Sequence, residues 1–384
     1  MFEGRGWSFN LLLLLLGIYL FVCSLCGLKA SWIIAFAAEG KEGLAKDYVS
    51  RVVGNPLSAL CAGIMATAIV QSSSGVVAVC IATVAAGGMT VAQAVPFVMG
   101  ANIGTTITSV LIALGYSFRK LEFSRAVPVA LANDVFKVLN VSVFFILEST
   151  THLLSRSSTF LAGLIGNFPV IGAVLGGFPD FIDVFTDPAV QPAVETITVI
   201  FGKTLLAAAI TGIASFIVLL LSLEFMSTSV QNFMKDMAAD SVDRAFKTPF
   251  RGIVVGSSVT WVLQSSSVAT ALAIPFVASG AVSLKKIYPY LLGCNIGTTI
   301  DPGQIISYIK FGVLGLSVGL VHVIINVIGV TLWLITPGLR DLPLLLTSRV
   351  SNVIVSSRNG AVSLVMFALI MFFIIPGLVI YLGG

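Results

Sequence analysis

Apolar stretches separated by short polar or charged segments set the pattern of the whole chain. Several of these stretches reach the roughly 20 residues that a helix needs to cross the hydrocarbon core of a bilayer. The pattern therefore predicts membrane-crossing helices, with the connections in the charged segments between them. The predicted crossings lie at residues 9–28, 91–114, 126–147, 195–223, 287–308, 311–336 and 361–381.

Two further apolar stretches are too long for one crossing and too short for two. Residues 56–88 and 249–281 each carry the polar sequence Gln-Ser-Ser-Ser near the middle. Two half-helices that meet at a polar turn, a re-entrant hairpin, fit this length. Irregular backbone at membrane depth is tolerated only when protein buries it or when it lines a water-filled cavity. Each hairpin is therefore expected inside the protein.

Two of the predicted crossings also contain a polar interruption. The sequence Gly-x-Asn-Ile-Gly-Thr-Thr stands at residues 100–106 in the stretch 91–114, and at residues 293–299 in the stretch 287–308. We call these two segments the polar islands. Their glycines permit backbone conformations outside the helix, so both crossings are predicted to be broken helices.

The hairpins and the islands form an internal duplication. Residues 56–106 and 249–299 align without a gap at an offset of 193 positions, and 19 of the 51 aligned pairs are identical. Three predicted crossings separate the two hairpins, and an odd number of crossings turns the second copy upside down relative to the first. Inverted repeats with broken helices that meet near the membrane midplane are typical of secondary transporters.

These elements divide the chain into six parts. The parts are an N-terminal span with an interfacial connector at 1–55, the first transport repeat at 56–147, an external loop at 148–194, a span with a connector at 195–248, the second, inverted repeat at 249–336, and a loop with the C-terminal span at 337–384. The external loop is poor in lysine and arginine, whereas residues 224–251 are rich in them. Because basic residues concentrate on the cytoplasmic side, this agrees with the loop outside the cell and residues 224–251 inside it.

Composition supports a membrane location and excludes several classes of function. Hydrophobic residues make up 57% of the chain and charged residues 10%, with a mean hydropathy of +1.04, whereas soluble domains carry about 25% charged residues. The sequence therefore predicts an all-α polytopic membrane protein. The net charge of +4 is small and spread over loops, so no nucleic-acid partner is expected. No catalytic set, Walker loop or metal-ligand cluster occurs, which predicts transport driven by an ion gradient and no enzymatic activity.

The serine motifs can bind an anion. A half-helix that starts at Ser72–Ser74 leaves its first backbone N–H groups without helical partners. These donors, the hydroxyls and the positive end of the helix dipole all favour negative charge. The inverted copy would aim Ser265–Ser267 at the same point from the other side. Chloride, sulfate, phosphate and a carboxylate all satisfy this argument, and a single such motif also occurs where small residues merely pack helices closely.

Oxygen atoms at the breaks can bind sodium. Unwound carbonyls, amides and hydroxyls are hard ligands that other broken-helix transporters use for this ion. Asp301 adds a carboxylate within a membrane segment, which is usually functional, although it also fits a cap at an Asp-Pro-Gly turn; the first copy has Thr108 there. The candidate ligands are Gln264, Ser265, Thr298 and Asp301 in the second copy and Gln71, Asn102, Thr105 and Thr106 in the first.

Three other polar residues lie inside predicted crossings. Asp134 and Lys137 are one helical turn apart, so they can form an ion pair, and a structural pair has at least as much support as a role in transport. His322 can couple protons, but a packed histidine bonded to a carbonyl fits the same position.

The doubled motifs resemble the type II sodium–phosphate cotransporter family, and the resemblance covers residues 56–326. It implies that the two serine motifs form the path of substrate and sodium, and that phosphate moves with two or three sodium ions. The phosphate-binding residues that it implies are Ser72, Ser73, Ser74, Ser265, Ser266, Ser267, Asn102 and Asn295. The implied sodium-binding residues are Gln71, Thr105, Thr106, Gln264, Ser265, Thr298, Thr299 and Asp301. The family has threonine where this chain has Asp301.

The function expected from the sequence is sodium-coupled symport of inorganic phosphate into the cell by alternating access. The expected partners are phosphate, sodium ions and the lipid bilayer, with no organic cofactor. The expected location is the plasma membrane, here the inner membrane of a bacterium. Symport of another small anion such as sulfate and a passive anion channel are the alternatives, and the sequence leaves monomer and homodimer open.

Overall fold

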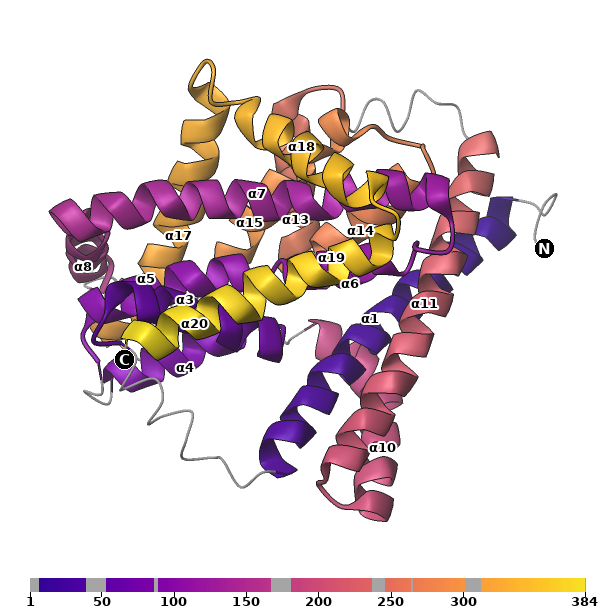
Figure 1. Ribbon diagram of the computed structural model, residues 1–384, viewed down its shortest axis with the longest axis horizontal. Coiled ribbons are helices and arrows are strands. Elements are labelled where there is room, and N and C mark those ends of the chain that lie inside the picture. Colours follow the sequence, from indigo (N-terminus) through magenta and orange to yellow (C-terminus); the bar gives the residue numbers. More distant parts are fainter. Residues whose placement is uncertain are drawn as a thin grey trace.

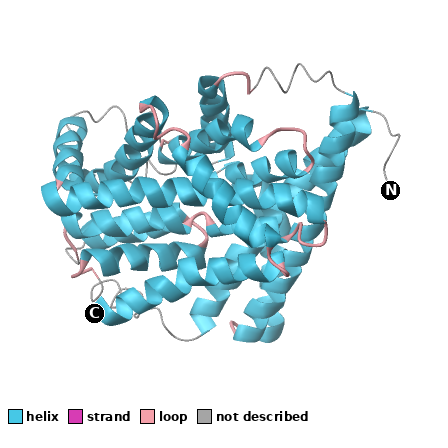
Figure 2. Cartoon of the chain, turned by 45° about the horizontal axis from the view of Figure 1, so that its top comes forward, coloured by secondary structure: helices cyan, strands magenta, loops and turns pink. Residues whose placement is uncertain are grey.

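The computed structural model describes residues 7–38, 53–85, 89–166, 181–236, 246–263, 265–300 and 312–383. Within these ranges every regular element is a helix, as Figure 2 shows. Among the described residues, four helical segments are long and apolar enough to cross a membrane, at residues 91–114, 120–151, 313–335 and 360–383. The chain is therefore an all-α polytopic membrane protein, as the hydrophobic pattern predicted.

The described residues of the first copy fold into five helices. They are α3 (Pro56–Val70), α4 (Ser73–Ala85), α5 (Val91–Gly104), α6 (Ile107–Leu114) and α7 (Lys120–Thr151). Side chains before the helices set two of their starts. The Asn55 side-chain Oδ1 atom accepts a hydrogen bond from the Leu57 N–H at 2.9 Å, and Thr90 and Gln93 form a capping box at the start of α5. Both contacts satisfy otherwise unpaired backbone donors.

The second copy has matching helices among the described residues. They are α13 (Pro249–Leu263), α14 (Ser266–Ala278), α15 (Leu284–Thr299) and α17 (Gly312–Ile335). The first residues of α13, α14 and α15 each lie 193 positions after those of α3, α4 and α5. The repeated sequence thus produces repeated helix boundaries.

Glycines allow one pair of helices in each copy to pack with their backbones in contact. A side chain at Gly63 would overlap the Phe97 carbonyl oxygen where α3 meets α5, and one at Gly256 would overlap the Tyr290 carbonyl oxygen where α13 meets α15. Small residues at such crossings let membrane helices approach closely. The same packing therefore recurs in both copies.

Two long helices lie side by side at one end of the molecule. They are α1 (Trp7–Ala38) and α11 (Leu205–Asp236), and α10 (Phe181–Phe201) lies beside them (Figure 1). The predicted crossing at 195–223 is interrupted here, because α10 ends at Phe201 and Gly202 adopts a positive φ of 68°. This left-handed conformation is readily available to glycine and ends the helix.

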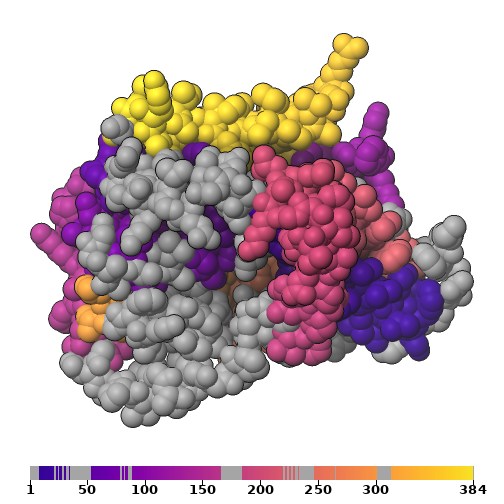
Figure 3. All heavy atoms as spheres, turned by 90° about the horizontal axis from the view of Figure 1, so that it is seen from below, coloured from indigo at the N-terminus to yellow at the C-terminus, as the bar shows by residue number. Residues whose placement is uncertain are grey.

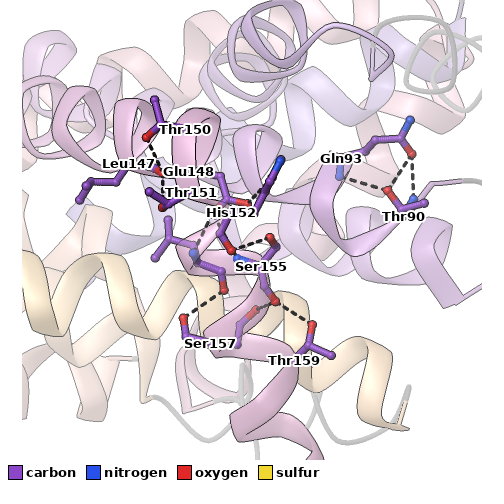
Figure 4. A network of polar contacts seen from close by, with 12 residues as sticks. Thr90, Gln93, Leu147, Glu148, Thr150, Thr151, His152, Ser155, Ser157 and Thr159 are labelled. Carbon is purple, nitrogen blue, oxygen red and sulfur yellow. Dashed lines mark hydrogen bonds and ion pairs between the residues drawn. The ribbon is translucent and has the colours of Figure 1, made fainter.

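The segment predicted as an external loop, residues 148–194, contains α8 (Leu153–Gly166) and the first part of α10. A sharp corner joins α7 to α8 (Figure 4). His152 ends α7 in a left-handed conformation with φ 54°, and the Glu148 Oε2 atom accepts hydrogen bonds from the backbone N–H groups of Leu154 and Ser155 at 2.7 and 3.2 Å. A carboxylate at a helix N-terminus satisfies free donors and complements the helix dipole.

The C-terminal helices lie along one side of the molecule, as the yellow segment in Figure 3 shows. They are α18 (Leu342–Ser356), α19 (Gly360–Leu369), the π-helical turn Ile370–Ile374 and α20 (Ile375–Gly383). Large apolar side chains on this side are exposed, for example Val362, Leu378 and Tyr381. An exposed apolar face of this kind suits contact with lipid.

Candidate functional site

The first serine motif stands at a break between two helices. α3 ends at Val70, and Gln71 adopts a left-handed conformation with φ 55° while its N–H donates to the Thr67 carbonyl oxygen at 2.7 Å. Such a conformation is uncommon for a residue other than glycine. The Ser72 hydroxyl oxygen accepts from the Gly75 N–H at 3.1 Å, so Ser72 caps α4, and Ser73 and Ser74 form its first turn.

The second serine motif makes the same kind of start. Gln264 lies outside the described residues, and α13 ends just before it at Leu263. Ser265 is extended, and its hydroxyl oxygen accepts from the Val268 N–H at 3.3 Å, so it caps α14 as Ser72 caps α4. Ser266 and Ser267 are buried in the first turn of α14.

In both motifs the capping hydroxyl uses its oxygen as an acceptor, which leaves its proton free to donate to a ligand. The second serine of each motif is buried with 6% of its surface exposed, at Ser73 and Ser266. No hydrogen bond joins either of these two hydroxyls to another described residue. Each helix start therefore offers hydroxyl and backbone donors together.

The threonines of the two polar islands have matching contacts. Thr105 and Thr298 donate to the carbonyl oxygens of Ala101 and Cys294 on their own helices at 2.9 and 3.0 Å. Thr106 and Thr299 likewise donate back to residues 103 and 296, both at 2.8 Å. A hydroxyl that donates its proton to a helix keeps lone pairs, and such oxygens can bind a cation.

The islands differ in how the helix continues. In the first copy α5 ends at Gly104 and α6 begins at Ile107, so the helix is interrupted at the island itself. In the second copy α15 is helical to Thr299. Asp301 lies outside the described residues, and so does the segment 301–311 that follows the second island.

The island asparagines reach across to the other copy. The Asn102 Nδ2 atom donates to the Asn326 Oδ1 atom on α17 at 3.2 Å, and the Asn295 Nδ2 atom donates to the Asn133 Oδ1 atom on α7 at 2.8 Å. All four side chains are buried. No role was expected for Asn133 or Asn326, although the offset of 193 that relates Asn102 to Asn295 also relates these two positions.

The helices that start at the serine motifs also pack across the duplication. α4 contacts α17 of the second copy, and α14 contacts α7 of the first. Each serine motif therefore begins a helix that packs against the long span of the opposite copy.

Two charged residues of α7 are buried near the same helices. Asp134 and Lys137 have 3% and 2% of their surface exposed. Neither carboxylate oxygen of Asp134 has a hydrogen-bond partner among the described residues, so the direct ion pair that the sequence permitted is not formed among the described residues. His322 on α17 is buried as well.

Comparison with known proteins identifies the family. The family model described as Na+/Pi-cotransporter matches residues 35–166 and 218–377, which is more than half of the chain. The chain belongs to this family. The first matched range includes the serine motif and island of the first copy, and the second range includes those of the second copy.

Individual members of the Na+/Pi-cotransporter family match almost the whole chain. Sodium-dependent phosphate transport protein 2A of Rattus norvegicus is 28% identical over 442 residues, which cover 95% of this chain and 66% of that protein. Sodium-dependent phosphate transport protein 2B of Homo sapiens is 26% identical over 469 residues, which cover 98% of this chain and 65% of that protein. The chain thus spans just under two thirds of the length of these relatives, and no solved structure matches it.

Proposed function

We propose that the chain is a sodium-coupled symporter that carries inorganic phosphate into the cell by alternating access. The proposal is based on a candidate site that occurs twice in a chain of the Na+/Pi-cotransporter family. Each copy has a serine-capped helix start and a polar island, and the two copies are 193 positions apart. Its relatives are named as sodium-dependent phosphate transport proteins. A plasma-membrane location, the inner membrane in a bacterium, follows from this function.

The anion is proposed to bind at the starts of α4 and α14. Each start combines free backbone N–H groups, serine hydroxyls and the positive end of a 13-residue helix, and these features favour negative charge. A phosphate oxyanion has several acceptor oxygens and can engage donors from both starts at once. Ser72, Ser73 and Ser74 would bind it from one copy, and Ser265–Ser267 from the other.

The sodium ions are proposed to bind oxygen atoms beside the anion. The described candidates are the buried hydroxyls of Thr105, Thr106, Thr298 and Thr299, with Gln71 and Ser265 at the helix breaks. Gln264 and Asp301 complete the proposed set from outside the described residues. Hydroxyl, amide and carboxylate oxygens are ligands that hard cations prefer, and broken-helix transporters place them near the membrane midplane.

We further propose that the two copies are inverted repeats related by a two-fold axis in the membrane plane, with re-entrant hairpins at the serine motifs. One contact supports the axis. The Trp333 Nε1 atom of α17 donates to the Asn140 Oδ1 atom of α7 at 3.2 Å, and these two residues occupy equivalent positions, 193 apart. A position that touches its own equivalent lies on the symmetry axis. Alternating access would then be a movement of one repeat against the other.

Uptake of radiolabelled phosphate by proteoliposomes tests the proposed function. With the purified chain we expect rapid uptake under an inward sodium gradient, and uptake near that of protein-free liposomes when choline replaces sodium. If phosphate is the substrate, excess sulfate should change the initial rate of phosphate uptake by no more than about twofold relative to the rate without sulfate. Equal uptake in sodium and choline would favour a passive channel, and full competition by sulfate would favour a transporter of another anion.

A further inference from the structure

Two asparagine pairs form one contact twice. The pair of Asn102 with Asn326 and the pair of Asn295 with Asn133 each join an island helix of one copy to the long span of the other. Adding 193 to the residues of one copy gives the residues of the other, since Asn102 becomes Asn295 and Asn133 becomes Asn326. We call these two hydrogen-bonded pairs the amide clasp.

The direction of donation is the same in both halves of the clasp. The side-chain N–H group of the island asparagine donates, and the side-chain oxygen of the span asparagine accepts. In α17 the Asn326 Nδ2 atom also donates to the His322 carbonyl oxygen at 2.9 Å. This second bond fixes the Asn326 amide with its oxygen toward Asn102, so in this half the span sets which end of the Asn102 amide faces away from it.

One end of the clasp leaves an oxygen without a partner. The Asn295 side chain is only 2% exposed, and its Oδ1 atom has no hydrogen-bond partner among the described residues. A buried acceptor without a partner is destabilising, so the native protein is expected to supply a ligand for it. An amide oxygen has lone pairs and no proton, so it attracts a cation and repels the oxygens of phosphate.

A second oxygen lies one helical turn further along α15. The buried Thr298 hydroxyl donates its proton to the Cys294 carbonyl oxygen at 3.0 Å, which leaves its lone pairs available. Residues three positions apart lie on the same helix face, so Asn295 and Thr298 offer two acceptors on one side of α15.

We propose that Asn133 is a positioning residue that holds the Asn295 amide, through the clasp, with its carbonyl oxygen as a ligand of the transported sodium ion. Asn326 has the equivalent role toward Asn102 in the other half. This proposal rests on the proposed symport function and changes the role expected for Asn295 from phosphate binding to cation binding. It also means that each repeat sets the geometry of the island in the other.

Equilibrium binding of radiolabelled sodium to the purified full-length chain in detergent tests the clasp. We expect Asn295→Ala and Asn133→Ala each to raise the half-saturating sodium concentration about tenfold. In the Asn295→Ala background, Asn133→Ala should add less than twofold, because Asn133 acts through Asn295. If Asn133 only stabilised the fold, Asn133→Ala would reduce sodium binding by the same factor in the Asn295→Ala background as in the unmodified chain.

The controls remove hydroxyls from the same two spans. Ser142 on α7 and Thr331 on α17 are exposed and donate to carbonyl oxygens of their own helices, so Ser142→Ala and Thr331→Ala should leave sodium binding unchanged. If Asn133→Ala is not recovered as folded protein, Asn133→Ser is the second variant, because its side chain is too short to reach Asn295 and should give the same tenfold loss.

Three results would overturn the clasp: sodium binding unchanged in Asn133→Ala, additive losses in the double variant, or no saturable sodium binding by the unmodified chain. Phosphate uptake by the same preparations separates this failure from failure of the proposed function. Sodium-dependent phosphate uptake together with any of the first two results would leave the symporter intact and remove the clasp.

Discussion

Gly100→Ala and Gly293→Ala are each expected to lose most of the folded protein. A Cβ atom at Gly100 would overlap the Leu60 carbonyl oxygen, and one at Gly293 would overlap the Ile253 carbonyl oxygen. In both cases the obstacle is backbone of the facing helix, which cannot rotate away as a side chain can. Overpacking of a core costs about 1–3 kcal/mol and sometimes more, and we expect the upper end of this range at both positions.

The measurement is the amount of monodisperse protein recovered in detergent and its temperature of unfolding. Gly163→Ala is the matched control, because Gly163 lies within α8 and no described atom outside its own helix backbone is within 4 Å of a Cβ atom built there. In a helix interior alanine is favoured over glycine by about 1 kcal/mol, so this control should be at least as stable as the unmodified chain. Normal recovery of both Gly100→Ala and Gly293→Ala would contradict the repeated backbone contact.

The double variant Ser73→Ala/Ser266→Ala is expected to lose nearly all phosphate uptake while it remains folded. Both residues are buried at the first turn of a helix, and no hydrogen bond joins their hydroxyls to another described residue. A hydrogen bond to a charged group contributes about 1.5–3 kcal/mol. We therefore expect each single variant to raise the KM for phosphate about tenfold and the double variant about hundredfold.

Initial rates of phosphate uptake in proteoliposomes at saturating sodium check this prediction. Ser348→Ala is the control, since the exposed Ser348 hydroxyl donates only to the Leu345 carbonyl oxygen of its own helix in the described structure. The thermal stability of all variants should match that of the unmodified chain. A double variant with an unchanged KM for phosphate would show that these serines merely pack the helices.

The sequence predicted the helix boundaries best where it repeats. The breaks at the two serine motifs follow from polar residues inside apolar stretches, and the observed starts at Ser73 and Ser266 agree with that pattern. The offset of 193 also predicts that packing recurs, as the contacts of Gly63 and Gly256 show. Local polarity and repetition are both visible in a sequence without any knowledge of tertiary contacts.

Features that depend on one residue's conformation or on distant contacts were not predicted. Gly202 ends α10 inside an apolar stretch, because its left-handed conformation leaves no mark in the hydrophobic pattern. Glu148 lies in the segment predicted as an external loop, but it belongs to α7 and caps α8. Asn133 lies 162 residues from its partner Asn295, and Asn326 lies 224 residues from its partner Asn102. Asn133 and Asn326 are themselves 193 positions apart, and only this match to the offset of the duplication could have indicated that they act together.

Accumulation of phosphate against its gradient tests the central claim most directly. Proteoliposomes that contain the chain receive equal labelled phosphate inside and outside, an inward sodium gradient, and, in a parallel sample, an ionophore that collapses this gradient. A symporter should raise the internal phosphate above the external level several-fold and lose the excess when the ionophore is added. Internal phosphate that never exceeds the external level, with or without the sodium gradient, would contradict coupling and show that the chain only conducts the anion.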